Sequence, residues 1–82
     1  MMDRAKRFQQ EISKIFKVQV RVYLDQKPHG NDMWWYYTYK LKVNGIYIKA
    51  QIPCDDLQTK ADKVVLRMIL EQIFSEIRFF YT

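Results

Sequence analysis

Two runs of alternating apolar and polar residues flank the dipeptide Asn44-Gly45, and this pattern predicts a β-hairpin. The runs cover residues 35–43 and 46–52. Asn and Gly tolerate the positive φ angles of a type I′ turn, so Val43 is expected to face Ile46 across an antiparallel pair. This register places Leu41, Tyr39, Tyr37, Ile48, Ala50 and Ile52 on one face and Lys42, Lys40, Thr38, Tyr47, Lys49 and Gln51 on the other. The first face is predicted to be core, and the second an aromatic, lysine-rich surface.

Two further segments have the periodicity of an amphipathic helix, from Asp3 to about Lys17 and from Lys60 to about Arg78. Their apolar positions are Ala5, Phe8, Ile12, Ile15 and Phe16 in the first, and Ala61, Val65, Leu66, Ile69, Leu70, Ile73, Phe74 and Ile77 in the second. Thr59 followed by Asp62 matches a helix-capping pattern, and Asp55 or Asp56 is an alternative cap for an earlier start. The second helix is therefore predicted to be the main cover of the core.

The segment between the first helix and the hairpin predicts one more strand, because Val18, Val20, Val22 and Leu24 alternate with polar residues. Residues 26–33 lack periodicity and contain Pro, Gly, Asn and Asp, which predicts a mobile loop. Pro53 ends the hairpin, and residues 54–58 are expected to be a connection. The predicted fold is α+β, with the order αβββα: a three-stranded antiparallel meander with both helices on one face, in a single domain of residues 1–82.

Composition narrows the class of partner. The 82 residues include 14 Lys and Arg against 9 Asp and Glu, a formal net charge of +5, which favours nucleic acid or an acidic protein surface. The lone Cys54 cannot form an internal disulfide, and no apolar stretch is long enough for a signal peptide or a membrane span. We therefore expect a cytoplasmic protein that does not enter a membrane.

The element order resembles that of the double-stranded RNA-binding domain over nearly the whole chain. The resemblance implies contacts with duplex RNA from the first helix, from the loop between the first two strands and from lysines that open the second helix. The residues at these places are Arg4, Lys6, Arg7 and Gln10; His29, within the run Lys27 to Gly30; and Lys60, Lys63 and Arg67. The chain departs from the family where Asp62 lies among the lysines and where Val64, Val65 and Leu66 replace a run of alanines. The stripe from Lys60 to Arg67 also has a plain interpretation, which the sequence favours: a solvated helix face with Arg67 partly paired to Glu71.

The outer face of the sheet offers a different binding surface. It combines flat rings with cations: Arg21, Tyr23, Trp34, Tyr36, Lys40, Lys42, Tyr47 and Lys49. Such a surface suits single-stranded nucleic acid, because rings stack on bases while cations hold phosphates. Exposed rings are equally typical of a protein interface, and cross-strand aromatic pairs also stabilise a sheet without any ligand. At the C-terminus, Phe79, Phe80 and Tyr81 either fold back onto the core or form a homodimer contact.

Catalytic chemistry has little support in the sequence. His29 and Cys54 have no evident partners, Asp55 and Asp56 suit a turn, and two glycines make no phosphate-binding loop. We expect no enzyme activity, no cofactor and no metal. The leading hypothesis is a small non-catalytic protein that contacts nucleic acid, either duplex RNA or single strands, through basic residues. The alternative is a protein-interaction module, such as a small phage-encoded inhibitor or adaptor that covers a site on a larger host protein.

Overall fold

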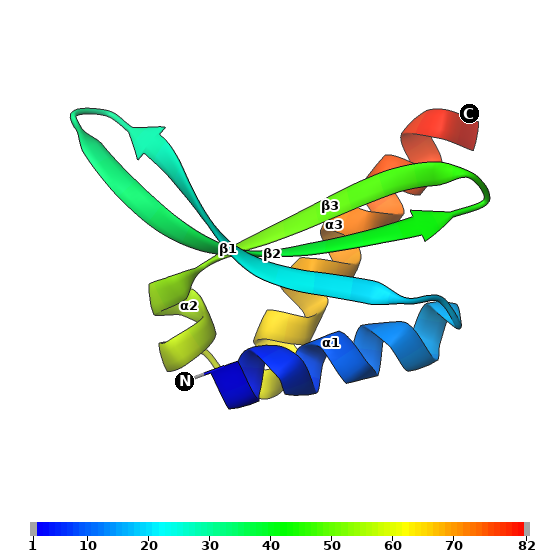
Figure 1. Ribbon diagram of the computed structural model, residues 1–82, viewed down its shortest axis with the longest axis horizontal. Coiled ribbons are helices and arrows are strands. Elements are labelled where there is room, and N and C mark those ends of the chain that lie inside the picture. The colour runs from blue at the N-terminus through cyan, green and yellow to red at the C-terminus, as the bar shows by residue number, and fades with distance from the viewer. Residues whose placement is uncertain (1, 82) are drawn as a thin grey trace.

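Three antiparallel strands in the order β1-β2-β3 form one open sheet, and helices α1 and α3 cover one of its faces (Figure 1). The elements are α1 (Met2–Phe16), β1 (Val20–His29), β2 (Asp32–Val43), β3 (Ile46–Pro53), α2 (Cys54–Thr59) and α3 (Asp62–Tyr81). This computed structural model describes residues 2–81, and the side chains of residues 3–79. The predicted α+β fold of αβββα order is confirmed, with the short α2 as an addition before the long second helix.

The turn at Asn44-Gly45 sets the register as predicted. Asn44 has a φ of 51° and Gly45 a φ of 83°, both in the left-handed region that a type I′ turn requires. Val43 pairs with Ile46, and this pairing extends along β2 and β3 to Tyr36 opposite Pro53. The alternation of side chains therefore separates the core face of the sheet from its open face. The predicted exposure of the open face is wrong at Thr38, which is fully buried and whose hydroxyl oxygen accepts a hydrogen bond from the Gln51 side-chain amide at 3.0 Å.

The core lies between the sheet and the two long helices. It contains Ala5, Phe8 and Ile12 of α1, Val65, Ile69 and Ile73 of α3, and inward residues of all three strands. Tyr39 of the central strand is fully buried, and its hydroxyl donates a hydrogen bond to the carbonyl oxygen of Ala5 at 2.9 Å. Burial, followed by the charge on Tyr37, raises the pKa of Tyr39 far above its ordinary value, so the phenol stays protonated. This hydrogen bond holds α1 against the centre of the sheet.

The loop predicted for residues 26–33 is wrong. β1 continues to His29 and β2 begins at Asp32, so the two strands form a long hairpin closed by Gly30 and Asn31. Its distal part extends well beyond the helices, at the upper left of Figure 1. Pattern alone missed this hairpin because both of its faces are exposed from Gln26 onward, and no burial enforces an apolar alternation there.

The predicted connection at residues 54–58 is also wrong, because these residues form most of helix α2, which buries Leu57. The capping prediction for Thr59 fails with it. The Thr59 hydroxyl donates to the carbonyl oxygen of Asp55 at 2.7 Å, so it closes the end of α2 and does not start α3. Asp55 and Asp56 lie inside the first turn of α2, which has no side-chain cap.

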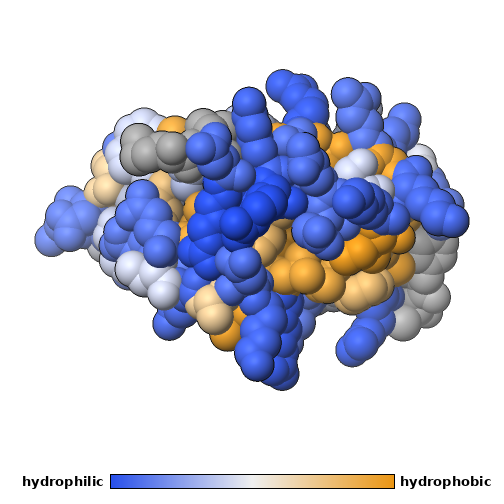
Figure 2. Space-filling view, turned by 90° about the horizontal axis from the view of Figure 1, so that it is seen from below, coloured by the Kyte–Doolittle hydropathy of each residue, from blue (hydrophilic) through white to orange (hydrophobic). Residues whose placement is uncertain are grey.

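Four apolar residues predicted to face the core do not reach it. Ala61 precedes α3 and is exposed, and Ile15, Leu24 and Phe74 are close to half exposed. Seen from the helix side, the molecule therefore shows apolar side chains among its polar ones (Figure 2). The periodicity identified the helices correctly, but two helices on a sheet this small leave part of each apolar stripe uncovered.

Candidate nucleic-acid interface

Three cations form a continuous row across the open face of the sheet. Arg21 of β1 lies opposite Lys40 of β2, and Lys40 lies opposite Lys49 of β3. Directly opposed side chains on one face of a sheet are near neighbours, so three like charges in this row repel one another. The row therefore costs stability in the free protein, and an anion laid across it would relieve that repulsion.

Tyr47 lies next to this row, and two lysines contact its ring. The ammonium nitrogens of Lys40 and Lys42 lie 5.0 Å and 5.1 Å from the centre of its ring, within the range of a cation–π contact. Tyr47 is 64% exposed, so much of this residue is accessible to a ligand. We refer to Arg21, Lys40, Lys42, Tyr47 and Lys49 as the cationic face.

The cationic face is hollowed beside the row. Arg21, Lys40, Lys42 and Tyr47 line a shallow depression of about 360 Å³ together with Val18, Gln19 and Leu41. No ion pair joins any cation of this face to an acid within the described part of the chain. At the β3 end of the row, Lys49 lines a second hollow together with Glu71 and Glu76 of α3, so acids lie near this cation without forming an ion pair with it.

The remaining rings predicted for the sheet face are less available than Tyr47. Tyr23 and Tyr36 are half-buried. Trp34 lies on the distal hairpin, where its indole stacks on the His29 imidazole with ring centres 3.7 Å apart and planes 12° apart. The register therefore places Tyr23 two positions from Arg21, beside the cationic row, whereas Tyr36 and Trp34 continue the same face toward the tip of the hairpin.

On the helix side, acids neutralise part of the positive charge implied by the resemblance to the RNA-binding domain. Asp62 accepts hydrogen bonds from Arg4 and Arg7, each at 2.7 Å. The hydrogen bond from Arg4, aided by the positive charges of both arginines, holds the pKa of Asp62 below its usual range. Arg4 also donates to the carbonyl oxygens of Leu57 and Lys60, which fastens α1 to α2 and to the residue that follows it.

The other predicted residues of this surface are spread over three elements. Lys6 and Gln10 are exposed on α1, and Lys60 and Lys63 are exposed around the start of α3. Arg67 forms an ion pair with Glu71 at 3.1 Å, as the plain interpretation of that helix predicted. His29 is the last residue of β1 and pairs with Asp32 near the tip of the projecting hairpin (Figure 1). The structure thus joins Arg4 and Arg7 through an acid but does not gather the whole set.

Cys54 and the C-terminal aromatic residues lie outside both of these surfaces. Cys54 is a free thiol, and burial, followed by the neighbouring charge of Asp55, raises its pKa. Phe79 is exposed, whereas the side chains of Phe80 and Tyr81, which belong to the predicted dimer contact, lie outside the described residues.

Comparisons of the chain with protein-family models, with curated proteins and with solved structures find no match. In the described part of the chain, no helix has the length and apolar character needed to cross a membrane.

Proposed function

We propose that this protein binds single-stranded nucleic acid on the cationic face of its sheet and catalyses no reaction. The observation that carries the proposal is the row Arg21-Lys40-Lys49, in which Lys40 lies opposite both other cations and none of the three forms an ion pair with an acid among the described residues. A polyanion supplies the missing counter-charges at regular spacing, and binding releases the salt ions that otherwise screen them. The lone free cysteine fits a cytoplasmic site of action.

A single strand fits this surface better than a duplex. Tyr47 offers a ring on which a base can stack, and the surrounding lysines can hold the flanking phosphates. A protein that recognises duplex RNA by shape contacts the phosphates and 2′-hydroxyl groups of the RNA, and in this protein the helices, not the sheet, would make those contacts. On that side Asp62 neutralises charge from Arg4 and Arg7, which disfavours the approach of a phosphate backbone.

Two matched double variants test the proposal. Lys40→Gln with Lys49→Gln removes two charges from the cationic face, whereas Lys60→Gln with Lys63→Gln removes the same net charge from the helix side. Fluorescence anisotropy with a labelled single strand of about 12 nucleotides should show binding weakened about tenfold by the first pair and within about twofold of wild type for the second. Tyr47→Ala should weaken it by about 1–3 kcal/mol through lost stacking.

Other outcomes identify the other hypotheses. If the second pair alone weakens binding, and a duplex RNA of equal length competes better than the single strand, the helix side is the binding surface and our assignment is wrong. If wild-type protein binds none of these probes even at low salt, the protein-interaction hypothesis replaces nucleic-acid binding.

A further inference from the structure

The projecting β1–β2 hairpin has an unpaired backbone edge where β3 ends. β2 begins at Asp32, but its pairing with β3 begins only at Tyr36 opposite Pro53. Residues 32–35 of β2 therefore have a neighbouring strand on the β1 side alone. An edge of this kind is a template on which another strand can pair.

The register identifies which backbone groups face this edge. In an antiparallel ladder the residues alternate between pairs that exchange hydrogen bonds and pairs that do not. The two-residue turn at Gly30-Asn31 makes His29 and Asp32 an exchanging pair, so Trp34 also bonds to β1. Met33 and Trp35 then direct their N–H and C=O groups away from β1, toward the space that β3 has left.

Apolar side chains surround this edge. Met33 and Trp35 are 51% and 52% exposed, and Leu24, on the same face of the hairpin, is also close to half exposed. This face continues the core face of the sheet, but neither long helix reaches it (Figure 1). A contiguous exposed apolar surface of this kind is typical of an interaction site.

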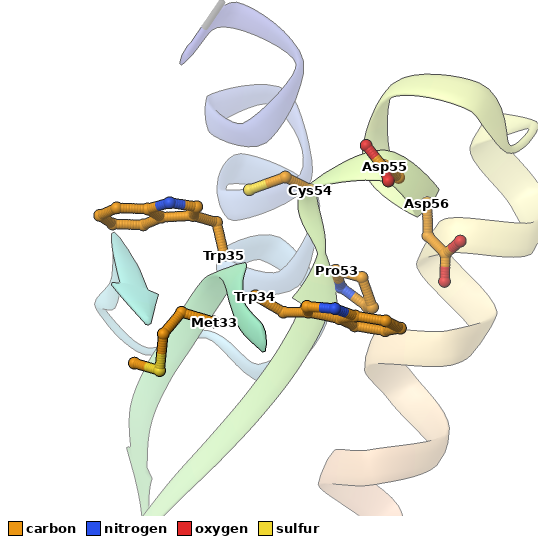
Figure 3. Close-up of a pocket in the computed structure, with 7 residues that line it drawn as sticks. All are labelled: Met33, Trp34, Trp35, Pro53, Cys54, Asp55 and Asp56. Atoms are coloured by element: carbon orange, nitrogen blue, oxygen red, sulfur yellow. The ribbon is translucent and has the colours of Figure 1, made fainter. Parts of the chain in front are cut away.

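A hollow of about 410 Å³ lies between the edge and the start of α2. Met33, Trp34 and Trp35 form one side of it, and residues 53–56 form the other. Figure 3 shows the Trp34 ring near Pro53 and the Trp35 ring on the side of Cys54, with Asp55 and Asp56 on α2 beyond them. Asp55 and Asp56 have no cationic partner among the described residues, so in a protein of net charge +5 this is an acidic site.

We propose that this edge binds an extended peptide segment of alternating apolar and basic residues, by strand addition to Met33–Trp35. The backbone of the segment pairs with the free N–H and C=O groups, its apolar side chains contact the exposed apolar face of the hairpin, and its basic side chains reach Asp55 and Asp56. The site is separate from the cationic face, so this inference does not rest on the proposed nucleic-acid binding.

The intrinsic fluorescence of the protein tests the proposal directly, because its two tryptophans are both at the site. The probe is the blocked peptide acetyl-Lys-Val-Lys-Val-Lys-amide, and we expect a saturable change in tryptophan emission. A Glu-Val peptide of the same length should bind at least about tenfold more weakly, because it places like charges beside the two aspartates. The same Lys-Val peptide with its valine amides N-methylated should lose binding, because it lacks the two valine N–H groups that would donate to the edge.

A pair of variants separates the acids from general electrostatics. Asp55→Asn with Asp56→Asn should weaken the Lys-Val peptide about fivefold, the order expected for two exposed ion pairs. Glu71→Gln with Glu76→Gln changes the net charge equally on α3 and should leave the affinity unchanged. The proposal is overturned if the Lys-Val peptide produces no saturable change, if the N-methylated or Glu-Val peptide binds equally well, or if both variant pairs respond alike.

Discussion

Gln72 of α3 closes the outer edge of β3 at Gln51. The Gln72 side-chain oxygen accepts the backbone N–H of Gln51 at 2.8 Å, and its amide nitrogen donates to the Gln51 carbonyl oxygen at 2.8 Å. One side chain thus supplies the two hydrogen bonds that a further strand would make at this residue. A helix residue therefore protects an edge that would otherwise be open to another chain.

Gln72→Ala should destabilise the protein by about 1–3 kcal/mol, because two part-buried backbone groups lose their partner. Urea unfolding followed by circular dichroism measures the change. Glu71→Ala is the control: it breaks only the exposed pair with Arg67 and should cost less than about 0.5 kcal/mol. Equal stability of Gln72→Ala and wild type would show that this contact does not support the edge.

Tyr39 should make stability fall at high pH. Its pKa in the folded protein lies above the ordinary value of 10.0, so the unfolded chain loses this proton first as pH rises. The stabilising effect is complete below pH 10.0 and is lost progressively above it as the pH approaches the folded pKa. Tyr39→Phe should cost about 1 kcal/mol at neutral pH and should show a shallower loss of stability above pH 10.0 than wild type. Parallel pH profiles for the two proteins would contradict this account.

Asp62 should make the stability of the protein fall at low pH. Its pKa is held below the ordinary value of 3.8 by the hydrogen bond from Arg4 and the nearby arginine charges, so its contribution is present above pH 3.8 and is lost as pH falls through the folded pKa. Asp62→Asn should therefore lower the free energy of unfolding at neutral pH, and the difference from wild type should shrink in acid. A difference that stays constant with pH would mean that the ion pairs do not cause it.

Removing a charge from the cationic row should stabilise the free protein. Lys40 has a like charge directly opposite on both sides, so Lys40→Gln should raise the free energy of unfolding by about 0.5 kcal/mol at low salt, and less at high salt. Lys6→Gln, at an exposed position of α1, is the control and should change stability little. A destabilised Lys40→Gln would show that the contact with Tyr47 outweighs the repulsion.

The sequence predicted those elements whose pattern is enforced locally. The dipeptide Asn44-Gly45 set the β2–β3 register, so the opposition of Lys40 and Lys49 followed from the sequence alone. The pairing of Arg21 with Lys40 did not, because it depends on the tight turn at Gly30-Asn31, in a segment without apolar alternation. The sequence therefore placed Arg21 on the correct face of the sheet but did not predict that it lies opposite Lys40.

The helix side was hardest to predict because long-range contacts decide it. Asp62 suggested a helix cap by its spacing from Thr59, but Arg4 and Arg7, more than fifty positions earlier in the chain, determine its role. Similarly, the unpaired edge at Met33 and Trp35 exists because β3 stops at Pro53 and α2 turns away. No local pattern indicates where a neighbouring strand will end.

The salt dependence of single-strand binding tests the central claim most directly. Each phosphate contact in a single strand contributes about 0.7 to the slope of log affinity against log salt concentration. Lys40→Gln with Lys49→Gln should therefore make this slope shallower by about 1.4, while Lys60→Gln with Lys63→Gln leaves it unchanged. An unchanged slope for the first pair, or the larger change for the second, would contradict binding on the cationic face.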